Sequence, residues 1–139
     1  MTGVPSGRVQ EGRPPRITVL LCEDSLGFRM LASAWLHDAD DMELVGVAET
    51  GREAVGLAEE LRPQVVLLDH LLPDADSSTL VARLREAAPG VAIALVSGMP
   101  HDLLATEAGR AGVEAFCSKA SEPSGFLTVV RRARAVAEE

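Results

Sequence analysis

Five polar residues of this chain follow short apolar runs, and together they have the functional groups of a chemical site. They are Glu23, Asp24, Asp69, Ser97 and Lys119. Three carboxylates that converge repel one another unless a cation lies between them. A hard, oxygen-seeking ion such as Mg²⁺, or Mn²⁺ in its place, suits such a cluster. If the fold brings these residues together, the sequence predicts a divalent-cation site with a hydroxyl and an ammonium group beside it.

Each residue also has a simpler interpretation when it is taken alone. Glu23 and Asp24 can cap a helix that follows a strand and make its first turn acidic. Asp69 can simply be the polar residue at which a strand ends. The joint occurrence of all five residues at corresponding strand ends favours a shared site over separate structural roles.

The apolar runs before these residues predict buried strands of a parallel sheet. The runs cover residues 17–22, 65–68, 91–96 and 113–117, and residues 43–48 predict a shorter edge strand. In open parallel α/β sheets, sites form at the carboxyl ends of the strands. The strand assignment therefore places all five polar residues on one rim of the sheet.

Five further segments have apolar residues at helical spacing. They span residues 26–37, 51–61, 77–87, 100–110 and 122–137. In the first of them, the spacing places Phe28, Leu31, Ala34 and Trp35 on one face, which we expect to pack inward. Five strands alternating with five helices require right-handed crossovers with helices on both faces of the sheet. We therefore expect an α/β fold with a doubly wound five-stranded parallel sheet.

Composition and charge narrow the classes of function. The chain is 47% hydrophobic and 24% charged, as in an ordinary globular domain, and its net charge is −8. Such an acidic body is a poor candidate for direct nucleic-acid binding. No apolar run reaches the roughly 18 residues of a membrane span, and the N-terminus lacks a signal-peptide pattern. We expect a cytoplasmic protein that contacts neither nucleic acid nor membrane directly.

The ends of the chain and its cysteines complete the outline. Residues 1–15 are rich in glycine and proline and predict a flexible leader, followed by one folded domain over residues 16–139. Cys22 and Cys117 are the two cysteines, both in apolar runs. We expect them to be buried, reduced thiols.

Four stretches of the sequence resemble the receiver domain of two-component response regulators. They are residues 17–24, ending in Glu23-Asp24, residues 65–76, residues 95–98, and residues 115–119, ending in Lys119. Each stretch alone is a weak signal, but four in this order at receiver-like spacings are highly specific. The resemblance covers about residues 16–137. It implies a flavodoxin-like (CheY-like) receiver fold with strand order 2-1-3-4-5 and the acidic cluster at the switch point.

The resemblance implies a phosphoacceptor and its metal site. Asp69 would be the carboxylate nucleophile that takes a phosphoryl group from the phosphohistidine of a sensor histidine kinase. Glu23, Asp24 and Asp69 would bind Mg²⁺, with the backbone carbonyl of Leu71 as a further ligand. The domain would catalyse only its own phosphorylation and dephosphorylation, and would not be an enzyme acting on a separate substrate.

The resemblance also implies a switch. Ser97 would donate a hydrogen bond to the phosphoryl group, and Lys119 would neutralise one of its oxygens. Phe116 matches the aromatic switch position; the alternative is an ordinary buried aromatic residue of an edge strand. The surface formed by the fourth helix, fifth strand and fifth helix would then change shape and control an output domain or partner.

The sequence departs from the usual receiver pattern at four places. The acidic pair is Glu–Asp, Ser97 replaces the more usual threonine, Ala120 stands where proline is common, and Asp76-Ser77 replaces Asp-Gly. None of these changes removes a required functional group. His70, next to the phosphoacceptor position, is interpreted as a solvent-facing loop residue.

The sequence indicates the phosphorylation site more clearly than the process that the domain controls. Details of the sequence resemble receivers of the nitrate-response/LuxR-type transcription-factor group, which favours control of transcription over a stand-alone single-domain regulator. Homodimers through the surface of the fourth helix, fifth strand and fifth helix, or through the first and fifth helices, are both compatible with this. The rival interpretations are a phosphorylation-independent interaction domain and a small Mg²⁺-dependent phosphatase. The phosphatase is disfavoured because no second acid stands two positions after Asp69.

Overall fold

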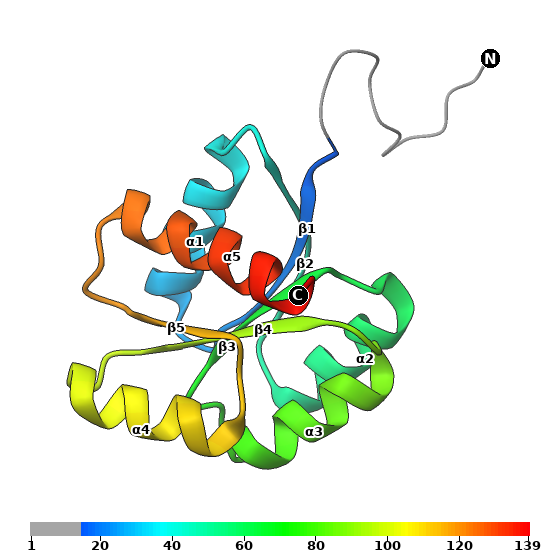
Figure 1. Cartoon of the computed structure of the whole chain (residues 1–139), viewed down its shortest axis with the longest axis vertical. Coiled ribbons are helices and arrows are strands. Elements are labelled where there is room, and N and C mark those ends of the chain that lie inside the picture. Colours follow the sequence, from blue (N-terminus) through cyan, green and yellow to red (C-terminus); the bar gives the residue numbers. More distant parts are fainter. Residues whose placement is uncertain (1–14) are drawn as a thin grey trace.

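The structure, a computed structural model, describes residues 15–139 as parallel strands alternating with helices (Figure 1). The strands are β1 (Ile17–Cys22), β2 (Met42–Ala48), β3 (Val65–Asp69), β4 (Ala92–Ser97) and β5 (Ala115–Ser118). The helices are α1 (Leu26–Asp38), α2 (Gly51–Leu61), α3 (Ser77–Ala87), α4 (His101–Ala111) and α5 (Pro123–Ala137). The strand order β2-β1-β3-β4-β5 confirms the predicted topology. The predicted leader lies, except for Pro15, outside the described residues.

The sheet is buried between two layers of helices (Figure 1). Helices α1 and α5 cover one face, and α2, α3 and α4 cover the other. Successive strand residues point to opposite faces: Leu20 and Val66 belong to the core under α2, α3 and α4, whereas Leu21 and Leu67 belong to the core under α1 and α5. Because both faces are covered, the central strands read as continuous apolar runs.

Three strands extend further toward the polar rim than the sequence indicated. Asp69, Ser97 and Ser118 are the last residues of β3, β4 and β5. Asp69 pairs with Val96, and Ser97 pairs with Ser118. The backbone of these polar residues is therefore held by the strand ladder.

The apolar face predicted for α1 is wrong in part. Leu31 is 48% exposed and Ala34 is also exposed, whereas Ala32 and Leu36 are fully buried. Phe28 is half-buried, four positions before Ala32, so the inward stripe runs through Phe28, Ala32 and Leu36. The small Ala32 side chain lets α1 approach the sheet closely, and the large aromatic residues lie at the margin that faces α5.

The two cysteines lie in the core, as the apolar runs around them indicated. Cys22 and Cys117 are buried free thiols, and burial raises the pKa of each. Across residues 15–139, no helix has the length and apolar character needed to cross a membrane.

Candidate functional site

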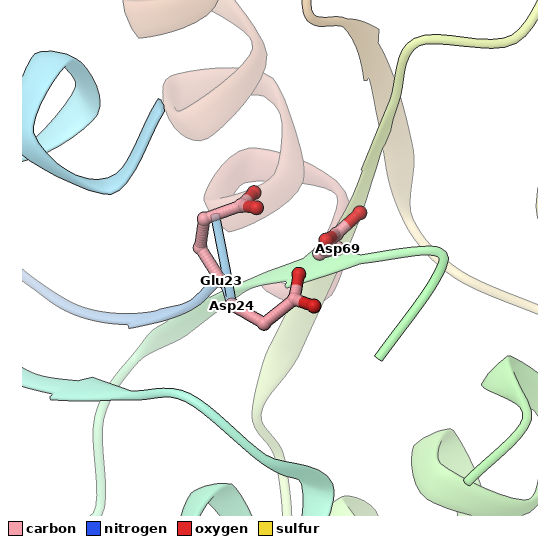
Figure 2. A group of neighbouring side chains, drawn as sticks. All are labelled: Glu23, Asp24 and Asp69. Atoms are coloured by element: carbon pink, nitrogen blue, oxygen red, sulfur yellow. The ribbon is translucent and has the colours of Figure 1, made fainter. Parts of the chain in front are cut away.

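The carboxyl ends of β1 and β3 bring three carboxylates together, as Figure 2 shows. Glu23 and Asp24 follow β1, and Asp69 ends β3. These strands pair directly, with Cys22 beside Leu68. One carboxylate oxygen from each acid lies within 4.8 Å of the other two. Asp69 is thus at least 45 positions from the other two acids in the sequence, and the three form the acidic cluster that the strand assignment predicted.

The three acids differ in their exposure to water. Glu23 is 1% exposed and Asp69 is 5% exposed, whereas Asp24 is exposed. Burial, and then the nearby charge of Glu23, raise the pKa of Asp69, while Lys119 and the N–H of Leu71 oppose this rise. Holding three carboxylates this close is unfavourable unless positive charge is present. Asp24 leaves the cluster open to solvent on one side.

Glu23 and Asp24 precede α1 rather than capping it. The N-cap of α1 is Ser25, and its backbone N–H donates to Oε2 of Glu23 at 3.0 Å. The interpretation of these acids as an N-cap with an acidic first turn is therefore wrong. Their carboxylates face the end of β3 instead.

Lys119 supplies positive charge directly at the cluster. It follows β5, and its backbone N–H donates to the carbonyl of Ser97 at 2.9 Å. Its Nζ lies 3.1 Å from each carboxylate oxygen of Glu23 and 3.5 Å from Oδ1 of Asp69. The side chain reaches across the end of the sheet, so the residue directly after β5 neutralises acids at the ends of β1 and β3.

Ser97 lies at the end of the strand next to Asp69. It is one residue beyond Val96, the register partner of Asp69, and it is 2% exposed. Its Oγ accepts a hydrogen bond from the N–H of Met99 at 3.1 Å. The hydroxyl proton thus remains available as a donor to a group at the site.

The two remaining predicted residues lie beside this centre. Leu71 lies two residues after the end of β3 and is 70% exposed. Its N–H donates to Oδ1 of Asp69 at 3.3 Å, which fixes the loop that carries the Leu71 carbonyl. Phe116 is half-buried in β5, and its ring centroid lies 5.4 Å from that of His101 at the start of α4. It lines a groove between α4, β5 and α5, together with Val129 and Arg132.

His70 is more enclosed than the sequence indicated. It is half-buried, and its Nδ1 lies 3.0 Å from Oγ of Ser77. Since the Ser77 hydroxyl donates to the His70 carbonyl at 3.2 Å, its oxygen is free to accept from a protonated Nδ1. The loop after Asp69 is thus attached to the start of α3.

Sequence reasoning missed two residues that hold the loops around the site. Arg29 donates from Nη1 to the carbonyl of Glu23 at 3.1 Å and to that of Asp24 at 3.4 Å. Asp74 accepts from the N–H groups of Gly51 at 2.6 Å and Arg52 at 3.0 Å, which ties the loop after β3 to the start of α2. These bonds join segments up to 23 positions apart, so spacing alone gave no signal for them.

This arrangement defines a class of protein. The sequence profile of the response regulator receiver domain matches residues 19–131, and the chain belongs to this family. The matched segment contains every residue of the site described above. Receiver domains are signalling domains that sensor kinases phosphorylate, and they generally bind Mg²⁺ at an acidic pocket.

A curated relative is also a response regulator. The response regulator protein VraR of Staphylococcus aureus is 28% identical over 116 residues, which cover 84% of this chain and 56% of VraR. The chain thus spans about half the length of this curated relative.

Solved structures show the same fold. The signal receiver domain of the putative response regulator NarL from Mycobacterium tuberculosis superposes with a TM-score of 0.80 at 24% identity, over 88% of this chain and 98% of that one. The response regulator domain of Thermotoga maritima CheB superposes with a TM-score of 0.76 at 27% identity. The match covers 86% of this chain and 97% of that one.

The donor set fits the divalent ion that the family generally binds. The cluster offers three oxygen donors within 4.8 Å of one another, and Asp24 leaves it open to water. Mg²⁺ favours such sites because it takes few carboxylates and retains several waters.

Proposed function

We propose that Asp69 accepts a phosphoryl group from the phosphohistidine of a sensor histidine kinase in a Mg²⁺-dependent reaction. One observation carries this proposal. The Asp69 carboxylate is 5% exposed, lies beside Glu23 and Asp24, and has Nζ of Lys119 at 3.5 Å. A buried carboxylate among two acids and an ammonium group is arranged to take up a dianionic group together with a cation.

The chemistry follows from the groups at the end of β3. A carboxylate oxygen of Asp69 attacks phosphorus, the P–N bond to the donor imidazole breaks, and the electron pair of that bond stays on the imidazole nitrogen. Glu23, Asp24, Asp69 and the backbone carbonyl of Leu71 would hold Mg²⁺, or Mn²⁺ in its place. The ion, when bound, neutralises charge on the oxygens of the transferring group. Lys119 provides a second positive charge for those oxygens.

The phosphoryl group would be sensed by Ser97 and Lys119. It adds about 1.5 to 2 negative charges and three strong acceptor oxygens. The Ser97 hydroxyl donates to one oxygen, which draws the loop after β4 inward. Phe116 then moves from the groove beside α4 toward the space vacated near Ser97. In this way the surface of α4, β5 and α5 changes shape when Asp69 is phosphorylated.

The changed surface would control an output domain or partner, which we propose to be a transcriptional one. VraR is named a response regulator, and a DNA-binding response regulator of the LuxR family from Staphylococcus aureus shares the fold with a TM-score of 0.76 at 19% identity. Direct DNA binding is disfavoured by the net charge of −8 of the whole chain. We place the domain in the cytoplasm, with homodimerisation through α4, β5 and α5 or through α1 and α5.

The proposal is tested by exposing the protein to acetyl phosphate and Mg²⁺ and measuring its intact mass. We expect the wild-type protein to gain one phosphoryl group. Neither wild type with EDTA in place of Mg²⁺ nor the Asp69→Asn variant should gain it. The matched control is Asp40→Asn, which removes an exposed aspartate from the turn between α1 and β2. A wild-type protein that gains no mass under these conditions, or a gain that persists in Asp69→Asn, overturns the proposal. A wild-type protein that gains no mass favours a phosphorylation-independent interaction domain.

A further inference from the structure

The geometry points to Phe28 as a positioning residue for Lys119 that also couples the phosphorylation site to the aromatic contacts between α1 and α5. This inference rests on the proposed function of Asp69. It concerns a residue that the receiver motif quoted above does not include. Phe28 lies in the first turn of α1, four positions after Asp24.

The ammonium group of Lys119 has an aromatic neighbour as well as its acidic ones. Nζ lies 5.1 Å from the ring centroid of Phe28, within the range in which a cation is attracted to a ring face. The same nitrogen is 3.1 Å from Glu23 and 3.5 Å from Asp69. The Lys119 side chain is 25% exposed, so protein groups have replaced much of its water. A strongly hydrated ammonium that has lost part of its water needs other partners, and here they include the two carboxylates and the ring face.

The Phe28 ring is itself held in position by two other aromatic residues. Its plane is nearly perpendicular to Trp35, at 87° and 6.1 Å between centroids, and to Phe126 of α5, at 78° and 6.1 Å. Trp35 and Phe126 also contact each other, with 5.2 Å between centroids. Edge-to-face contacts of this kind favour particular ring orientations. We call these three residues the α1–α5 aromatic cluster.

Two functional consequences follow. Before phosphorylation, the Phe28 ring limits the directions in which the flexible Lys119 side chain can turn, and so keeps the ammonium close to Asp69. When the phosphoryl group forms, the ammonium shifts toward its oxygens and its contact with Phe28 changes. Because Phe28 contacts both other members of the cluster, the packing between α1 and α5 responds to the state of Asp69.

The first test asks whether the Phe28 ring faces Lys119 in the metal-free, unphosphorylated protein. The NMR shifts of the Lys119 ε-methylene protons report this, because an aromatic face moves nearby protons upfield. We expect Phe28→Leu to remove the upfield shift and Phe28→Tyr to keep it. Trp35→Leu is the comparison, since it removes a ring that is not the one under Nζ; it should reduce the upfield shift less than Phe28→Leu does, because Phe126 still contacts the Phe28 ring. Unchanged Lys119 shifts in Phe28→Leu, or an equal loss in Trp35→Leu, overturn the inference.

The second test measures the rate of phosphorylation by acetyl phosphate at saturating Mg²⁺. We expect Phe28→Leu to slow it about two- to five-fold, the range of one partly exposed cation–π contact, and Phe28→Tyr to restore it. Mg²⁺ affinity should stay within about two-fold of wild type, since the hydrocarbon ring of Phe28 has no oxygen donor for the ion. A normal rate in Phe28→Leu, or no rescue by Phe28→Tyr, contradicts a positioning role. Thermal unfolding of each variant shows whether it is folded.

The third test uses the tryptophan emission of the protein. Trp35 is the only tryptophan and the chain has no tyrosine, so emission reports the α1–α5 aromatic cluster directly. We expect phosphorylation to change the emission of wild type and to leave that of Phe28→Leu nearly unchanged. An identical response in both proteins overturns the coupling. If wild type gains no phosphoryl group by mass, the proposed function fails, whereas the NMR test still decides whether Phe28 positions Lys119.

Discussion

Lys119 and Glu23 are 96 positions apart in the sequence, yet Nζ of the lysine lies 3.1 Å from both carboxylate oxygens of the glutamate. The glutamate side chain is 1% exposed and the lysine side chain 25% exposed. Removing one partner of such a pair leaves a charge without compensation in a poorly hydrated place. The pair therefore determines how well the acidic cluster is tolerated in the absence of metal.

Replacing Lys119 by methionine should destabilise the metal-free protein by about 1–3 kcal/mol, because the carboxylates of Glu23 and Asp69 lose their positive neighbour. Added Mg²⁺ should recover much of this loss, since the ion supplies the missing charge. Thermal unfolding in EDTA and in excess Mg²⁺ measures both effects. A loss of stability that Mg²⁺ does not reduce means that Lys119 acts through packing instead.

The Asp69→Asn protein should be more stable than wild type without metal, by about 1 kcal/mol, because it removes a buried charge beside Glu23. The raised pKa of Asp69 has the same cause. The asparagine oxygen can still accept from the N–H of Leu71. Chemical denaturation in EDTA gives the difference, and a destabilised Asp69→Asn protein contradicts this explanation.

Asp24→Asn should weaken Mg²⁺ binding at least ten-fold, since the variant loses the exposed charged donor of the cluster. Titration calorimetry measures the affinity at constant ionic strength. Asp40→Asn has the same change in net charge at an exposed site outside the cluster and should bind Mg²⁺ as wild type does. Equal affinities in the two variants would place the ion elsewhere.

Ser97→Ala should still gain a phosphoryl group, because Asp69 remains, but the loop after β4 should no longer respond to it. Ser97→Thr keeps the hydroxyl and should retain the response. Backbone amide shifts of Met99 and Phe116, compared before and after phosphorylation, follow the loop and the switch. Large phosphorylation-dependent shifts in Ser97→Ala argue against a sensing role for the hydroxyl.

The Asp41–Arg131 ion pair should make a small, pH-dependent contribution to stability. Nε of Arg131 lies 2.7 Å from Oδ2 of Asp41 and Nη2 lies 3.1 Å from Oδ1, and this hydrogen bonding lowers the pKa of Asp41. Because the folded pKa is depressed, the contribution is fully present at pH values above the ordinary aspartate pKa. The contribution is lost as the pH falls through the lowered pKa that Asp41 has in the folded protein. Both side chains are more than a third exposed, so we expect about 0.5 kcal/mol at pH 7.

The measurement compares the free energy of unfolding of wild type and Asp41→Asn from pH 7 down to about pH 2.5. The difference should shrink toward zero at the acid end. The neighbouring variant Asp40→Asn, which removes an exposed carboxylate, serves as the control. A difference between wild type and Asp41→Asn that is constant with pH assigns the effect to packing rather than to charge.

Much of the fold could be predicted because its signals are local. The apolar run before Asp69 reads as a central strand because both faces of the sheet are covered, and residues 51–61 and 77–87 agree with the helices observed. The burial of single side chains was harder to predict, because it depends on which other elements pack beside them. Leu31 fits the apolar spacing of α1, but its burial depends on where the sheet and α5 lie, and it is 48% exposed.

By itself, the sequence determined the alternation of elements and the set of polar residues at the strand ends, including Glu23, Asp24 and Asp69. The reason is that side-chain periodicity and strand polarity are properties of the local chain. Only the tertiary structure decided that Lys119 reaches Glu23 across the sheet and that Phe28 lies beside its ammonium. It also decided that Arg29 and Asp74 hold the surrounding loops. Such contacts depend on how separate elements pack and which way long side chains turn, and no spacing along the chain encodes either.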